Sequence, residues 1–192
     1  MKLGRPVDLS MPAPNPFRRG TFLIALAAAL ALFLIMAQPR INDYSSNLQD
    51  PPQFASVSML PANKDSDMRF PEKNKRVIED FVKDELFILI PRSENRSASD
   101  VLSAGEQLMK EKEWEIIAIH PDQGIIEATV TTPALRFKDD FIMRVRTSQL
   151  SNDLRVDFRS KSRLGQSDFR ANLKRIRQFR QDLLQKLKEQ NQ

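Results

Sequence analysis

Two arginines and three serines gather near the C-terminal end of the chain, where a strand-like stretch gives way to a helix-like one. They are Arg159, Ser160, Ser162, Arg163 and Ser167. A guanidinium group binds phosphate or carboxylate through paired hydrogen bonds, and a helix that begins near Ser167 would direct free amide groups at the same anion. These five residues therefore form a candidate anion-binding site.

A structural role fits the same residue types, and we favour it. Ser167 or Asp168 would cap the helix, while Arg159 and Arg163 would pair with Asp168 and with one of two neighbouring aspartates. Those two aspartates point to opposite faces of a strand, so they are not expected to act together on one substrate. The candidates for these ion pairs and caps are Asp139, Asp140, Asp168 and Asn172.

Catalytic and metal-binding patterns are absent from the sequence. His120 is the single histidine, it falls in a predicted turn, and the chain has no cysteine. A metal site or a serine nucleophile needs several such groups at suitable spacing, and neither a nucleophile elbow nor a phosphate-binding loop occurs. We therefore expect no catalytic residue, no metal and no cofactor.

A stretch of seventeen residues without a charge, residues 21–37, lies near the N-terminus. As a helix it would be roughly 26 Å long, which is short but sufficient to cross a bilayer. Four basic residues and one acidic residue precede it, and acidic residues follow soon after it. The positive-inside rule then places the N-terminus in the cytoplasm and the rest of the chain in the periplasm.

A cleaved signal peptide is the alternative for this stretch, because a basic region followed by an apolar one is typical of both. Cleavage after Ala37 would put Ile35 where the peptidase requires a small residue. We therefore expect an uncleaved, single-pass anchor in the inner (cytoplasmic) membrane of a bacterium. Much of the chain's net charge of +5 belongs to this topology signal, since the residues through Ala37 carry +3.

The remaining residues predict an α+β domain. Four short β-like runs with short connections indicate an antiparallel sheet of four to five strands, with two amphipathic helices on one face. Strands are predicted at 86–90, 114–119, 125–131, 141–146 and 154–160, and helices from Ser97 or Ser99 to about Lys112 and from Ser167 onward. The predicted organisation is a tail over residues 1–20, a transmembrane helix over 21–37, an extended linker over 38–75 and the domain over 76–189.

The stretch from Phe158 to Ile176 resembles the closing motif of an uncharacterised bacterial family, domain of unknown function 1499. Further similar segments are residues 41–43, 50–54, 114–117, 126–129 and 137–140, so the resemblance covers about residues 41–187. Arg170 stands where the family pattern has glycine, and Ser45 and Ser46 replace two threonines. The positions that carry the motif are Arg159, Ser160, Ser162, Arg163, Gly165, Ser167, Asp168, Asn172, Arg175 and Ile176. The resemblance implies an architecture but no activity.

These observations predict a membrane-anchored, non-enzymatic binding domain or an accessory subunit of an inner-membrane assembly. The final segment, Ser167 to Gln192, carries net +4, which suits a protein partner or an anionic lipid, whereas an exported domain meets little nucleic acid. The alternative is an enzyme acting on an anionic, phosphorylated envelope lipid or metabolite, with Arg159 and Arg163 as anion ligands and Asp140 or Asp168 as base. Pure scaffolding through the linker is a third possibility.

Overall fold

The computed structural model describes residues 16–36, 40–81, 86–133, 135–148 and 151–190. The chain divides into two units, Met1–Gln38 and Pro39–Gln192, each of which is described by itself. Most of the predicted N-terminal tail and the last residue of the predicted transmembrane helix lie outside the described residues.

The first unit holds one helix, α1 (Pro16–Met36). Its described side chains, those of residues 21–34, are exposed, among them Phe22, Ile24 and Phe33. In the described part of the chain, no helix combines the length and the hydropathy required for a membrane crossing. The structure therefore does not support the transmembrane helix predicted over residues 21–37.

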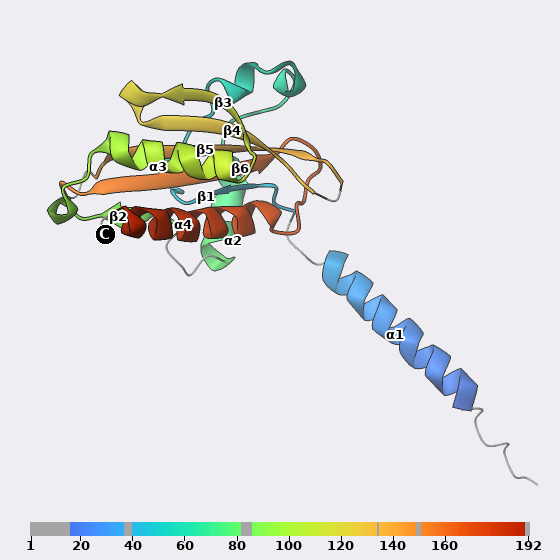
Figure 1. The fold of residues 1–192 in the computed structure, drawn as a ribbon. Coiled ribbons are helices and arrows are strands. Elements are labelled where there is room, and N and C mark those ends of the chain that lie inside the picture. Colours follow the sequence, from blue (N-terminus) through green and yellow to red (C-terminus); the bar gives the residue numbers. More distant parts are fainter. Residues whose placement is uncertain (1–15, 37–39, 82–85, 134, 149–150, 191–192) are drawn as a thin grey trace, which may run out of the picture. The chain divides into compact units, whose positions relative to one another are not determined.

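The second unit is built on one six-stranded sheet in which every pairing is antiparallel, so the predicted α+β class is confirmed (Figure 1). The strand order is β1-β6-β5-β4-β3, and β2 also pairs with β6. The strands are β1 (Asp43–Ser45), β2 (Ile88–Ile90), β3 (Glu115–His120), β4 (Ile125–Thr131), β5 (Lys138–Thr147) and β6 (Leu154–Ser162). The extra strand relative to the prediction is β1, which belongs to the residues predicted as a linker.

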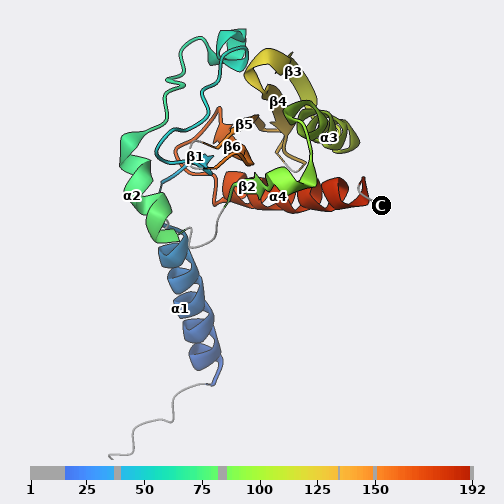
Figure 2. The ribbon, with the colours of Figure 1, turned by 90° about the vertical axis from the view of Figure 1, so that its left-hand side faces the viewer.

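Helices α3 (Ala98–Glu111) and α4 (Ala171–Glu189) cover one face of this sheet (Figures 1 and 2). Ser97 caps α3 in a capping box with Asp100, as the sequence predicted for this serine. Beneath the helices lies an aromatic cluster in which the Trp114 ring stacks on Phe179, with 5.2 Å between the ring centroids. This packing fixes α4 against the middle of the sheet.

The other sheet face is covered by residues that the sequence assigned to an extended linker. Phe54 and Val57 are buried there against Ile142 of β5. The same region includes helix α2 (Glu72–Phe81), which the sequence did not predict. Residues 40–75 therefore belong to the domain rather than to a separate linker, and they cover a sheet face that carries buried charged side chains together with the apolar Ile142.

The last helix begins later than predicted, at Ala171 rather than Ser167. Phe169 and Arg170 have φ angles of 51° and 66°, in the left-handed region, so the chain cannot be helical there. Arg170 occupies the position where the family pattern has glycine, the residue that adopts this conformation without strain. The loop between β6 and α4 therefore spans residues 163–170.

Candidate functional site

Arg159 of β6 lies inside the domain, on the sheet face opposite α3 and α4. Its side chain is fully buried and donates to both carboxylate oxygens of Asp43, at 2.9 and 2.8 Å. It also donates to the backbone carbonyls of Pro52 and Met68, at 3.0 and 2.8 Å. With these four hydrogen bonds the guanidinium group is engaged in a closed, buried ion pair.

Arg163 forms a second closed ion pair, with Asp140 of β5. The shortest N···O distance of this pair is 2.6 Å. The Asp140 carboxylate also accepts from the Thr129 hydroxyl and from the side-chain amide of Asn63. Because Asp140 is buried and surrounded by donors, it is not placed to take a proton from a substrate.

Ser160, Ser162 and Asn172 meet on the helix-covered face of the sheet. The Asn172 side-chain oxygen accepts from Ser160, at 2.6 Å, and its amide nitrogen donates to Ser162, at 2.8 Å. Arg175 of α4 donates to Ser160 and pairs with Asp139 at 2.6 Å. This network attaches the start of α4 to the ends of β5 and β6.

Asp168 holds the turn into α4. One of its carboxylate oxygens accepts from the backbone amide of Arg170, at 2.9 Å, and the other accepts from that of Asn172, at 2.7 Å. Burial raises the pKa of the Asp168 carboxyl above its usual value, with a smaller contribution from the charge of Asp139, while the hydrogen bonds to the backbone oppose the shift. Asp168 is thus the capping carboxylate of the final helix.

The five residues of the candidate anion site do not converge. Side chains alternate along β6, so Arg159 points to one face of the sheet while Ser160 and Ser162 point to the other. Arg163 turns toward Asp140 on the Arg159 side, and Ser167 lies in the loop before α4. For the same reason Asp139 and Asp140 pair on opposite faces, with different arginines.

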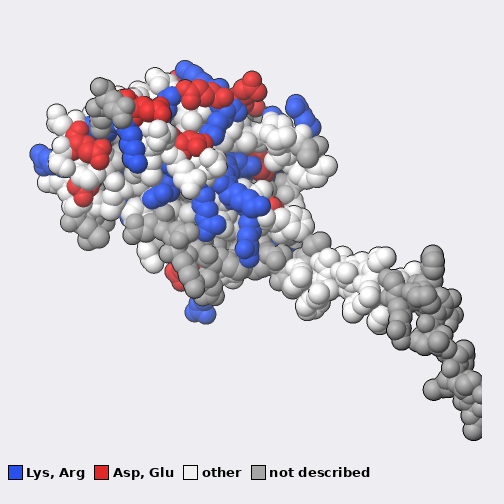
Figure 3. Space-filling view, turned by 60° about the horizontal axis from the view of Figure 1, so that its bottom comes forward, with Lys and Arg blue, Asp and Glu red and all other residues white. Residues whose placement is uncertain are grey.

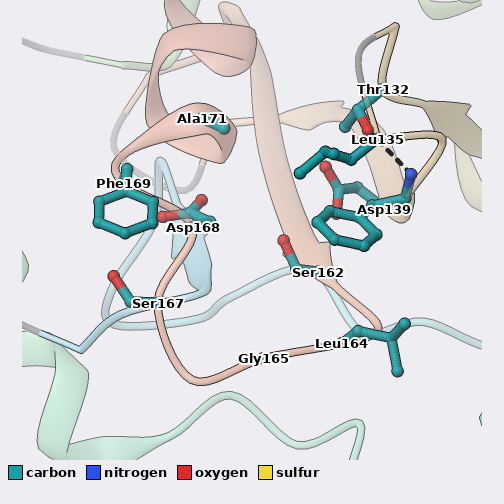
Figure 4. A pocket seen from close by; sticks show the side chains of 11 residues that line it. Thr132, Leu135, Asp139, Ser162, Leu164, Gly165, Ser167, Asp168, Phe169 and Ala171 are labelled. Carbon is teal, nitrogen blue, oxygen red and sulfur yellow. Dashed lines mark hydrogen bonds between the residues drawn. The ribbon is translucent and has the colours of Figure 1, made fainter.

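A pocket with a volume of about 350 Å³ opens between the loop before β5 and the loop before α4 (Figure 4). Polar groups of Asp139, Ser162 and Asp168 line part of it, and large apolar side chains form much of the rest. Its lining residues are Thr132, Leu135, Phe137, Asp139, Ser162, Leu164, Gly165, Ser167, Asp168, Phe169 and Ala171. Both the volume and the mixture of an apolar wall with a few polar groups are typical of small-molecule sites.

Asp157 forms a charged cluster that the sequence analysis missed. Its fully buried carboxylate accepts from Arg155 at 2.8 Å and from Arg144 at 3.1 Å, and it also pairs with Arg146. These arginines lie on adjacent strands on one face, which their alternation in the sequence could have indicated. Asp50 closes the cluster by pairing with Arg144 and Arg146.

His120 has a partner that the sequence did not reveal. Its Nε2 atom lies 2.9 Å from the hydroxyl oxygen of Ser56, which is 64 residues away in the chain. A serine and a histidine at this distance resemble two members of a catalytic triad, but a triad also needs an orienting acid and an oxyanion site. Within the described residues, no group of three or more histidine, cysteine, aspartate or glutamate side chains could hold a metal ion.

Basic side chains gather on the domain surface that includes α4 (Figure 3). Arg170, Lys174 and Lys188 are exposed at the start of the helix or along it. This surface borders the pocket at Arg170, so a negatively charged group would be attracted to the region outside the pocket, whereas two carboxylates line its interior.

Comparison with known proteins gives a family and no activity. No curated protein matches the chain. A family model matches residues 43–183 and thus includes β1, the six-stranded sheet and most of α4. The chain belongs to this family, which is described as protein of unknown function (DUF1499).

Proposed function

We propose that this protein is a non-enzymatic binding domain, held at the inner membrane by residues 21–37, whose ligand enters the pocket at the start of α4. One observation carries the proposal: the arginines of the family motif are engaged in closed ion pairs, while the neighbouring pocket has an open, largely apolar wall. The motif then supports the walls of the binding site rather than contacting the ligand.

The geometry argues against the enzyme alternative. An anion-binding enzyme needs arginines that face a substrate, whereas Arg159 and Arg163 face Asp43 and Asp140. Asp168, the other proposed base, has both carboxylate oxygens occupied by backbone amides of the helix start. Freeing the arginines from their ion pairs, or Asp168 from its backbone hydrogen bonds, would disrupt the fold that positions these groups.

The membrane attachment rests on the amino-acid sequence of residues 21–37 and on the exposed apolar side chains of residues 21–34. An uncovered apolar surface of this kind marks a membrane or protein contact. Positive charges before the stretch favour a cytoplasmic N-terminus and a periplasmic domain. The exposed basic side chains of α4 suit an anionic lipid surface, and a partner in a membrane assembly is the other fitting ligand.

The test is purification of the full-length protein from its own membranes in a mild detergent, followed by mass spectrometry of co-purifying proteins and lipids. Ala171→Phe places a large ring in the pocket, and Ala98→Phe is the matched control because Ala98 also opens a helix and is also partly buried. A partner or lipid that is lost with Ala171→Phe and kept with Ala98→Phe supports the proposal. Retention of every bound molecule by both variants contradicts it.

A further inference from the structure

Four large apolar side chains stand exposed around the mouth of the pocket. Leu135 is 68% exposed, Phe137 48%, Leu164 68% and Phe169 64%. They come from two loops, one before β5 and one between β6 and α4, and all four also line the pocket. A concentration of exposed apolar residues at a pocket mouth marks a surface that is covered when the protein functions.

The backbone holds one of these side chains in place at an energetic cost. Phe169 has a φ angle of 51°, and a bulky residue in the left-handed region is strained. The capping hydrogen bonds of Asp168 on the adjacent residues maintain this turn. Figure 4 shows the Phe169 ring beside Asp168 and Ala171, at the pocket wall.

The same loop is joined directly to the segment that follows the apolar stretch. The backbone amide of Asp168 donates to the carbonyl of Ile41, at 3.1 Å. The side-chain amide of Asn42 donates to the carbonyl of Gly165, at 2.5 Å. These two hydrogen bonds hold the loop of Leu164 and Phe169 against residues 41 and 42.

We propose that the pocket takes up an acyl chain of a lipid from the membrane that holds the protein. This inference rests on the proposed membrane attachment, because the membrane is the source of the acyl chain. The apolar rim contacts the lipid layer, the chain enters the pocket, and the lipid phosphate stays outside, near the exposed Arg170 and Lys174. The carboxylates of the interior exclude a phosphate from the pocket itself.

The test uses the full-length protein in lipid nanodiscs that contain a phospholipid with a photoreactive diazirine in its acyl tail. After irradiation, mass spectrometry maps the crosslinked peptides. We expect crosslinks on residues 162–171 and 132–139 in addition to residues 21–37. Ala171→Phe should reduce the pocket crosslinks about tenfold and leave those on residues 21–37 unchanged, whereas Ala98→Phe should leave both unchanged.

Crosslinks confined to residues 21–37 in the unaltered protein would overturn the lipid inference while leaving the proposed binding function open to a protein ligand.

A second measurement covers the possibility that Ala171→Phe does not fold. The chain has no cysteine, so the variants Leu164→Cys and Met59→Cys can each be labelled with a fluorophore at a single site. Position 59 is the control, because Met59 is 82% exposed and does not line the pocket. Brominated acyl chains should quench the label at position 164 and not that at position 59, and equal quenching would refute the inference.

Discussion

Replacing Arg159 by methionine tests whether the family motif serves the fold or a ligand. The substitution leaves the fully buried Asp43 carboxylate without its cation, and it removes the donors to the carbonyls of Pro52 and Met68. Breaking a buried ion pair by removing one partner costs about 3–5 kcal/mol. Since a domain of this size is stable by only about 5–15 kcal/mol, we expect Arg159→Met to lower the free energy of unfolding by a large fraction.

The assay is urea unfolding followed by the fluorescence of Trp114, the single tryptophan. Its ring packs against Phe141 and Phe179 in the core, so its emission reports the loss of tertiary packing. Lys161→Met is the matched control, because Lys161 is a partly exposed cation two residues further along the same strand, on the same face. We expect the control to change the free energy of unfolding by no more than about 0.5 kcal/mol.

A double variant separates the ion pair from other effects of the substitution. When Asp43→Leu accompanies Arg159→Met, the uncompensated charge disappears, and the double variant should be more stable than Arg159→Met alone. Arg159→Lys keeps the charge but loses the two-pronged geometry, so it should lie between the unaltered protein and Arg159→Met. A loss below about 1 kcal/mol for Arg159→Met, together with loss of a bound ligand, would refute the structural interpretation.

Three further predictions concern single groups. Burial and the charge of Asp168 raise the pKa of Tyr44, the one tyrosine, from 10.0 to about 12. Its ultraviolet absorbance should therefore show ionisation only well above pH 10 in the folded protein but near pH 10 in urea, and the folded protein should lose stability as the pH rises between these two pKa values. A folded midpoint near 10 would contradict the burial argument. Because the pKa of Asp168 is raised, the folded state binds more protons than the unfolded state at pH values above the ordinary pKa of 3.8. Thermal melts should therefore show stability falling as the pH rises through the raised pKa. Asp168→Asn should make stability depend less steeply on pH, while it loses a capping hydrogen bond. Gly124→Ala should destabilise by more than about 2 kcal/mol in the same melts, since φ is 67° and the new Cβ would lie 2.1 Å from the Val145 carbonyl oxygen. Gly165→Ala should lose only about 1 kcal/mol, because its φ is 83° but the new Cβ would lie 3.8 Å from the Ser167 carbonyl oxygen, an ordinary contact. Equal losses would show that strain rather than the clash decides.

The strands of the sheet were predictable wherever apolar and polar residues alternate along the strand itself. In β6 the alternation of Val156 and Phe158 with charged residues shows both the strand and its two faces. β1 escaped prediction because it has three residues, two of them polar, and is defined only by its pairing with β6, more than 100 residues away. The start of α4 was misplaced because Asp168 looks like a direct cap, although it acts across a left-handed turn.

The candidate site was predictable in its residue types and not in its partners. Nothing local connects Arg159 to Asp43, which lies 116 residues away. The candidate anion site required Arg159 and Ser160 to converge, whereas adjacent residues of a strand point to opposite faces. A usable signal for the pocket did exist, because Leu164 and Phe169 are large apolar residues within a polar loop.

The family motif and the proposed ligand site therefore have different physical tasks. Arg159, Arg163 and Asn172 tie β1, β5 and α4 to β6, so a chain with these residues acquires the same sheet and the same position for the final helix. The pocket surface that a ligand would touch comes mainly from the two loops around residues 132–137 and 164–169, whose apolar side chains make no such ties. Substitutions in these loops can change what enters the pocket at little expense to the fold, whereas substitutions in the motif remove the framework on which both loops rest. We therefore expect ligand preference within this architecture to follow the loops and stability to follow the motif.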